Sequence, residues 1–244
     1  MTSVRVWMVL GAAALAGCSG GAATTVGGDL GAKTDSGVDS GRVTHSRDGS
    51  ADAHVSADAG GPVKAECTYP AGPYGTNVGD VLDPTLAWQA YAPGATMPST
   101  LKISDLYDCD GTKGINAIVF DTSGQWCVAC QYEAQSVPSW MASTGAGAGH
   151  WTELGVHFVS LIIQNDAYAP ATIVTAQQWR TMFSLTSIYV AADPNASLPA
   201  VALPHNLLVD PRTMKIHTNL DNDKAAGTPQ ADPVVAALAK ANAK

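Results

Sequence analysis

The sequence predicts an α/β domain in which helices flank a central mixed β-sheet. Short apolar runs rich in β-branched residues alternate along the chain with segments of helical periodicity, which is the pattern of strands alternating with helices. Two closely spaced cysteines stand at the start of the first helical segment. Two further strands joined by a turn precede a last helix, so the predicted order is β-α-β-α-β followed by β-β-α.

The cysteine pair follows the first predicted strand and opens the first predicted helix. The run "INAIVF" at 115–120 follows the turn signal Asp110-Gly111 and predicts a buried strand. After a short loop, the segment "CVACQYEAQSVPSWMAS" begins at Cys127 and contains helix-forming residues, with Pro138 as the expected kink or end. The cysteine pair is therefore expected where this helix starts.

The later elements complete the alternation. The run "GVHFVSLII" at 155–163 predicts a second buried strand, and a helix expected from about residue 171 to residue 186 places Trp179, Met182 and Phe183 on one face. The remaining elements are a strand at 187–193, strands at 203–210 and 213–219 joined by a turn at Asp210-Pro211-Arg212, and a helix at 231–243 with Asp232 near its N-terminus and Pro233 suited to its first turn.

Residues 1–17 have the layout of a secretory signal peptide. One positive charge, Arg5, precedes an apolar run from Val6 to Ala16 that is shorter than the about 20 residues of a membrane-spanning helix. The run ends in "LAGC", which resembles the bacterial lipobox, and the resemblance implies that Cys18 is lipidated and becomes the new N-terminus. The alternative is an ordinary signal peptide followed by a chance cysteine.

Lipidation implies an extracytoplasmic protein that is held at a bacterial membrane by acyl chains. Ser19 stands where an aspartate favours the inner membrane, so the periplasmic face of the outer membrane is slightly favoured. Residues 18–63 begin with the lipidated cysteine, hold no aromatic residue and predict a flexible tether rich in Gly, Ser and Asp, followed by the folded domain at 64–244. The net charge is −8 without a basic cluster, which excludes nucleic acid as a partner.

The chain has five cysteines, and each is given a role. Lipidation accounts for Cys18, and Cys127 with Cys130 forms a CxxC pair, which leaves Cys67 and Cys109. Because disulfides persist in an oxidising compartment, we predict a structural disulfide between these two. Two buried free thiols, or a four-cysteine zinc site shared with the CxxC pair, are the alternatives.

From about Tyr69 to Lys244 the chain resembles the thioredoxin superfamily, and most nearly its membrane-tethered extracytoplasmic branch, the TlpA-like thiol-disulfide oxidoreductases and redoxins. The stretch Trp126-Cys127-Val128-Ala129-Cys130, with Glu133 three residues on, is similar to the WCxxCxxE pattern of that branch. Leu203-Pro204, at the start of a strand, resembles the cis-proline of the superfamily.

Two further features carry the resemblance, and one departs from it. Asp121 stands where thioredoxins have a buried aspartate beneath the active site, although a turn residue would fit the same spacing. The helix expected at 171–186 fits the insertion of the TlpA-like branch. The proline that the family has in its first helix is replaced here by Gln135.

The resemblance implies a thioredoxin-like fold and a thiol-disulfide oxidoreductase. Cys127 would be the nucleophile, because a helix N-terminus stabilises a thiolate, and Cys130 would resolve the mixed disulfide. Asp121 would take the proton from Cys130, and His205 would tune the site or contact the substrate. The substrate-binding residues that the resemblance implies are Trp126, Leu203 and Pro204.

The expected partners are disulfide-containing or dithiol proteins and an upstream membrane electron donor, and neither a cofactor nor a metal site is expected. A different class remains open: a thioredoxin-fold binding module that carries a metal or docks proteins without turnover. A thiol peroxidase is less favoured, because Gly124 and Phe120 stand where peroxiredoxins need a threonine and a proline.

Overall fold

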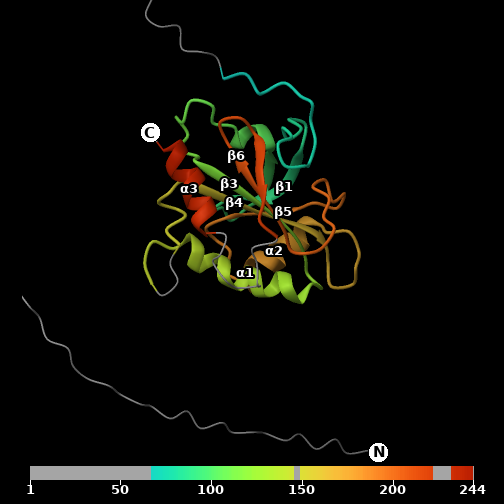
Figure 1. Ribbon diagram of the computed structural model, residues 1–244. Helices are drawn as coiled ribbons and strands as arrows, with labels where there is room; N and C mark the ends of the chain where they lie inside the picture. Colours follow the sequence, from blue (N-terminus) through green and yellow to red (C-terminus); the bar gives the residue numbers. More distant parts are fainter. Residues whose placement is uncertain (1–66, 146–148, 222–231, 244) are drawn as a thin grey trace, which may run out of the picture. The chain divides into compact units, whose positions relative to one another are not determined.

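Figure 1 shows the computed structural model, which describes residues 67–145, 149–221 and 232–243. The predicted signal peptide, the lipidated Cys18 and the predicted tether lie outside the described residues. In the part of the chain that is described, no helix has the length and apolar character needed to cross a membrane.

A mixed sheet forms the centre of the domain. Within the described ranges it has seven strands in the order β2-β1-β5-β4-β3-β6-β7. β3, β4 and β5 run parallel, whereas β6 lies antiparallel beside β3 and β7 antiparallel beside β6. The strands are β1 (Ala87–Tyr91), β2 (Ser99–Lys102), β3 (Ala117–Gly124), β4 (Val156–Gln164), β5 (Tyr189–Ala192), β6 (His205–Asp210) and β7 (Lys215–Asn219).

Helices connect the parallel strands. α1 (Val128–Met141) leads from β3 to β4, α2 (Ile173–Met182) leads from β4 to β5, and α3 (Asp232–Asn242) follows the β6–β7 hairpin (Figure 1). Crossover helices between parallel strands, followed by an antiparallel hairpin beside the strand that precedes the cysteines, are the topology of the thioredoxin-like fold. The predicted fold class is therefore confirmed.

The sequence pattern predicts no strand before residue 115, and this prediction is wrong. β1 pairs antiparallel with β2 and with β5, so the two strands extend the sheet beyond the parallel part. β1 alternates exposed and buried positions at its start, and β2 buries only Leu101, so neither has a continuous apolar run. Their partner β5 lies far along the chain, and local pattern does not reveal that pairing.

Element boundaries also differ. β3 continues to Gly124, which places Asp121 inside the strand, so the turn alternative for this residue is wrong. α1 continues past Pro138, and α2 ends at Met182, short of the expected end near residue 186.

Alternate residues of β3 face two hydrophobic cores. Ala117 and Val119 belong to the core beneath α1, α2 and α3, which also holds both cysteines of the CxxC pair. Ile118 and Phe120 belong to the core on the opposite face, where the segments before β3 pack. The period of two along a strand thus sorts side chains onto the helical face or the opposite face.

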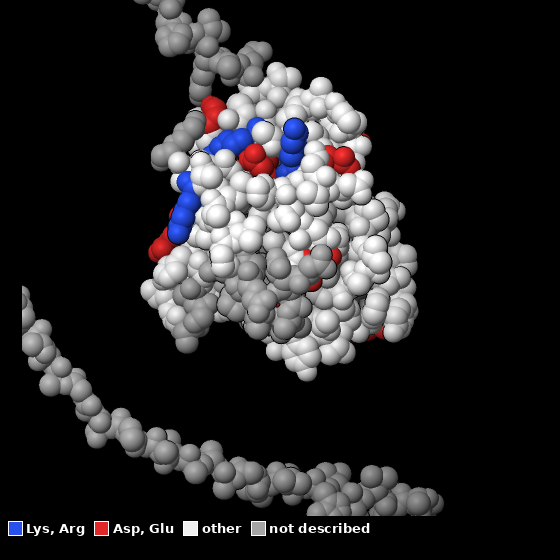
Figure 2. Space-filling view, in the orientation of Figure 1, with Lys and Arg blue, Asp and Glu red and all other residues white. Residues whose placement is uncertain are grey.

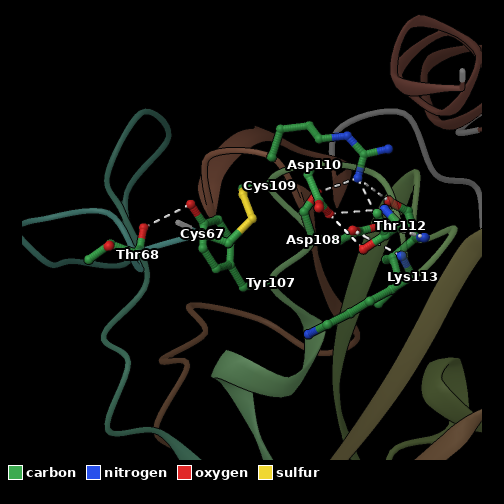
Figure 3. The surroundings of a disulfide bond; sticks show 10 residues. Cys67, Thr68, Tyr107, Asp108, Cys109, Asp110, Thr112 and Lys113 are labelled. Atoms are coloured by element: carbon green, nitrogen blue, oxygen red, sulfur yellow. Dashed lines mark hydrogen bonds and ion pairs between the residues drawn. A yellow bond between two sulfur atoms is a disulfide. The ribbon is translucent and has the colours of Figure 1, made fainter. Parts of the chain in front are cut away.

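Cys67 and Cys109 are joined by a disulfide that spans 42 residues of sequence (Figure 3). The bond holds the first described residues against the loop that precedes β3. Tyr107, from the same loop, donates its hydroxyl to the carbonyl oxygen of Thr68 at 2.9 Å, which strengthens this attachment.

Asp108, next to this disulfide, is a buried carboxylate near the start of β3. It accepts the backbone N–H group of Lys113 at 3.1 Å (Figure 3). It also accepts the backbone N–H group of Ile115 at 3.0 Å and forms an ion pair with Arg212 at 3.0 Å. Burial acts to raise its pKa, but the two N–H donors and the guanidinium outweigh burial, so the pKa of Asp108 lies below its ordinary value.

Replacing Cys67 and Cys109 together by serine should lower the free energy of unfolding by about 2–4 kcal/mol, because the bond closes a long loop in the unfolded chain. The matched control is the double serine variant of Cys127 and Cys130, whose bond spans 3 residues and should contribute less. Urea denaturation of the three proteins measures the difference. Equal midpoints for the wild type and the Cys67/Cys109 variant would contradict the prediction.

The lowered pKa of Asp108 predicts an acid-labile share of stability. A carboxylate with a lowered folded-state pKa stabilises the fold above its unfolded value, about 3.9, and loses this contribution as the pH falls through the folded value. The stability of the wild type should therefore fall below about pH 4 more steeply than that of Asp108→Asn. Urea midpoints from acid to neutral pH test this, with the exposed Asp166→Asn as control. Parallel curves for the wild type and Asp108→Asn would refute it.

Candidate active site

The CxxC pair lies where β3 passes into α1. Cys127 is the N-cap residue of α1, and its sulfur accepts the backbone N–H of Cys130 at 3.1 Å. The two cysteines are joined by a disulfide. Cys127 is 6% exposed and Cys130 is 0% exposed, so a molecule arriving from solvent reaches Cys127 first.

The helix start supplies the electrostatics of this position. The first N–H groups of a helix have no partner within the helix, and the peptide dipoles add a partial positive charge there. A sulfur at the N-cap accepts one of these N–H groups, which stabilises a negative charge on it. The arrangement therefore favours the thiolate of Cys127 when the disulfide is reduced.

Trp126 is held against the end of the sheet. Its indole N–H donates to the side-chain oxygen of Gln164 at 3.0 Å, and its ring stacks on Tyr168 with 4.9 Å between centroids. A Cβ at position 124 would lie 3.0 Å from the indole nitrogen, so the absent side chain of Gly124 leaves room for the ring. The backbone N–H of Gln125 also donates to the carbonyl oxygen of Gln164, at 3.0 Å.

Asp121 is a buried carboxylate on β3, 4% exposed. Ser123 donates its hydroxyl to the carboxylate at 2.9 Å, and Ser160 of β4 does the same at 2.9 Å. The alternation along β3 places Asp121 on the side of Val119, which is the face of the sheet that carries the CxxC pair. The structure thus brings Asp121 and both cysteines to one face.

Glu133 adds a second buried carboxyl group on this face. It lies on α1 one turn after Cys130 and is 2% exposed. The buried positions of α1 that surround it, Cys130, Ala134 and Val137, belong to the core of the helical face. Two acidic residues are therefore sequestered from water on the side of the sheet where Cys130 is buried.

Leu203 and Pro204 precede β6, and the peptide bond between them is cis. Leu203 packs, partly buried, against the core that contains both cysteines. His205 follows, and its Nδ1 forms a hydrogen bond with Asp221. His205 alternates with Leu207, which belongs to the opposite core, so its side chain lies on the other face of the sheet from the cysteines, and its expected role in tuning the site stays a prediction.

The structure also bears on metal binding. In the described ranges, one group of side chains brings three potential ligand atoms together: Cys67, Cys109 and Asp110, within 4.8 Å of one another. Its two sulfurs are bonded to each other and are not thiolates, and Cys127 and Cys130 form a separate disulfide. The four-cysteine zinc site is therefore not the observed arrangement.

Sequence analysis missed the polar partners of the site. Ser160, in the middle of β4, contacts Asp121 of β3. Gln164 and Tyr168, at the end of β4 and just after it, both contact Trp126. These residues have only a weak signature in the sequence, because their contacts depend on the register in which β4 lies beside β3. The one local sign was Ser160, a polar residue within the otherwise apolar run from Phe158 to Ile163.

No protein-family model matches the chain, and no curated protein matches it. Among solved structures, it is similar to a thiol:disulfide interchange protein from a Bacteroides species, with 12% identity, 67% of this chain and 91% of the other covered, and a TM-score of 0.45. It is also similar to the thioredoxin domain of a thiol-disulfide oxidoreductase from Bacteroides vulgatus (14% identity, 66% and 99% covered, TM-score 0.45). A third is the reduced 2-Cys peroxiredoxin of Plasmodium vivax (11% identity, 67% and 97% covered, TM-score 0.49).

Replacing Asp121 by alanine should lower the free energy of unfolding by about 1–3 kcal/mol, because the hydroxyl groups of Ser123 and Ser160 then lose a buried acceptor. Asp121→Asn keeps an acceptor oxygen and should lose less. Urea denaturation at neutral pH compares the two variants with the wild type. An alanine variant as stable as the wild type would show that the hydroxyl groups do not depend on Asp121.

Proposed function

We propose that this protein is a thiol-disulfide oxidoreductase that uses Cys127 and Cys130 to reduce or exchange disulfides in other proteins. The observation that supports this most directly is the position of Cys127, whose sulfur caps α1 and accepts the N–H of Cys130. A capped sulfur next to a fully buried partner is suited to an attacking thiolate followed by a resolving thiol.

The proposed reaction has two exchange steps. The Cys127 thiolate attacks one sulfur of a substrate disulfide, forms a mixed disulfide and expels the other substrate sulfur as a thiolate. Cys130, once deprotonated, attacks the Cys127 sulfur, forms the bond between the two cysteines and releases the second substrate thiolate. The substrate gains two electrons, and a dithiol donor restores the reduced pair by the same steps in reverse.

Asp121 is the residue to which we assign the proton of Cys130. The resolving step needs a base, because Cys130 is buried away from water. A carboxylate on the same face of the sheet, held by two hydroxyl groups, is oriented for this task. We assign to Trp126, Leu203 and Pro204 the contact with the substrate chain, since Trp126 adjoins Cys127 and Leu203 packs against the same core.

We place the protein outside the cytoplasm, anchored to a bacterial membrane through Cys18, with the outer membrane slightly favoured. The signal-like residues 1–17, the lipobox-like "LAGC" and the tether-like composition up to residue 63 support this placement. The disulfide between Cys67 and Cys109 accords with an oxidising compartment. The substrates would be secreted disulfide or dithiol proteins, and the electron donor a membrane dithiol protein.

Two serine variants test the function. Cys127→Ser should abolish the reduction of insulin by dithiothreitol that the wild type catalyses, because the attacking sulfur is gone. Cys130→Ser should also lose turnover but should accumulate a mixed disulfide at Cys127, because the resolving sulfur is gone. Non-reducing electrophoresis and mass spectrometry identify the trapped adduct.

Turnover and adduct formation in the two serine variants together distinguish the possible functions. Cys127→Ser with wild-type turnover would rule out the proposal. An adduct at Cys130 in Cys127→Ser, without one at Cys127 in the other variant, would reverse the roles. Absent turnover together with stoichiometric copper binding by the reduced wild type would favour the metal-carrying module.

A further inference from the structure

A tight turn follows β4 and carries an exposed aromatic ring. The side chain of Asn165 accepts the backbone N–H groups of Ala167 and Ala169, at 2.9 and 3.0 Å, and its backbone N–H donates to the carbonyl oxygen of Ala169 at 2.9 Å. At the tip of this turn Tyr168 has a φ of 60°. These hydrogen bonds hold the backbone from which the Tyr168 ring projects.

A left-handed backbone at a bulky residue costs free energy, and glycine or asparagine is the usual choice there. The core does not account for the tyrosine, because its side chain is 63% exposed. Its hydroxyl makes no hydrogen bond with any described residue. A strained, exposed aromatic residue is a feature that points to function, because the surrounding structure keeps it despite the cost.

The contact that Tyr168 does make leads to the active site. Its ring stacks on Trp126, the residue next to Cys127, at 27° between the ring planes. Trp126 is fixed by its hydrogen bond to Gln164 and by close packing on Gly124. Trp126 and Tyr168 thus form one rigid surface beside the attacking sulfur, here named the aromatic platform, with Tyr168 as its exposed part.

The surroundings of the aromatic platform suit an extended chain of low charge. An open hollow of about 590 Å³ is lined by Gln125, Asp166, Gln177, Gln178, Thr181 and Met182. Gln125 adjoins Trp126 in sequence, and Asp166 belongs to the turn that carries Tyr168. Gln125 is buried and donates its side-chain N–H group to the carbonyl oxygen of Thr175 and to Oε1 of Gln178, each at 3.4 Å, so Gln177 and the NH2 group of Gln178 are the amide groups that face a peptide backbone. One carboxylate is the lone charged group of the lining.

The charged groups of the surface also favour a substrate chain of low charge. On the face shown in Figure 2, lysine and arginine side chains gather over the upper part of the molecule. Arg180 of α2 is not part of the lining of the hollow, and its guanidinium lies over the ring of Tyr91. A partner rich in acidic groups would find no matching cations in the lining of the hollow. The side chains that line the hollow therefore favour a neutral, partly apolar peptide.

We propose that Tyr168 is a specificity-determining residue: the aromatic platform binds an aromatic or apolar side chain next to the reacting cysteine of a polypeptide substrate. This rests on the proposed function and narrows it to protein disulfides with such a neighbour. A rigid aromatic surface contributes contact area at little entropic cost, and stacking of two aromatic rings adds about 0.5–1.5 kcal/mol, or about two- to twelvefold in affinity.

The test compares two disulfide peptides that differ in one residue beside the cysteine, tyrosine or serine. The wild type should prefer the tyrosine peptide in kcat/KM, and Tyr168→Gly, which accepts the left-handed backbone, should lose about two- to twelvefold of that preference. Tyr168→Phe should keep it, because the ring remains. The matched control is Tyr132→Ala, which removes another exposed tyrosine, 57% exposed, from α1.

An unchanged preference in Tyr168→Gly, or an equal loss in Tyr132→Ala, would overturn the inference. Binding of the two peptides with alanine in place of cysteine to the oxidised protein, measured by calorimetry, gives the same ratio without turnover. A wild type that binds the tyrosine peptide preferentially but reduces neither disulfide would sink the proposed function and leave the aromatic platform standing. A wild type that reduces both peptides equally would sink the aromatic platform alone.

Discussion

The capping of α1 by the sulfur of Cys127 is the interaction on which the site depends. It requires β3 to end and α1 to begin within three residues, so the connection must turn sharply at the edge of the sheet. β3 is held on both sides, by β4 and by β6, and this fixes the point from which the turn starts. Gly124 lies at an irregularity of the β3–β4 register and gives the indole of Trp126 its place. The sulfur position is thus set by the sheet and not by the helix alone.

The two buried aspartates of the β3 region have different partners. Asp108, near the start of β3, is balanced by Arg212 and by backbone N–H groups, so it acts as a structural anchor for the loop that carries Cys109. Asp121, near the end of β3, accepts neutral hydroxyl groups from Ser123 and Ser160. These hydroxyl groups orient the carboxylate, which suits it to accept a proton. The same residue type therefore serves the fold at one end of the strand and suits chemistry at the other.

The parts that sequence analysis predicted are those that depend on neighbours along the chain. The apolar run of β3 and the cysteine at the start of α1 follow from local patterns, and the parallel core of the sheet follows from the order of the elements. The cis bond before β6 was expected from the family resemblance of Leu203-Pro204. β1 and β2 were missed because their partly exposed pattern acquires meaning only beside β5. The partners of Asp121 and Trp126 were missed for the same reason, since Ser160 and Gln164 come into reach only through the register of β4.

The end of β4 and its following turn give the site a rigid side and an open side. Gln164 binds the backbone of Gln125 and the indole of Trp126, and Tyr168 covers that indole, so this side of Cys127 is fixed by contacts that come from outside α1. On α1 itself, Val128 is 60% exposed and has no such support. A partner that docks on preformed surface loses less entropy than one that must order its site. We therefore expect a substrate chain to approach Cys127 from the side of the turn that carries Tyr168.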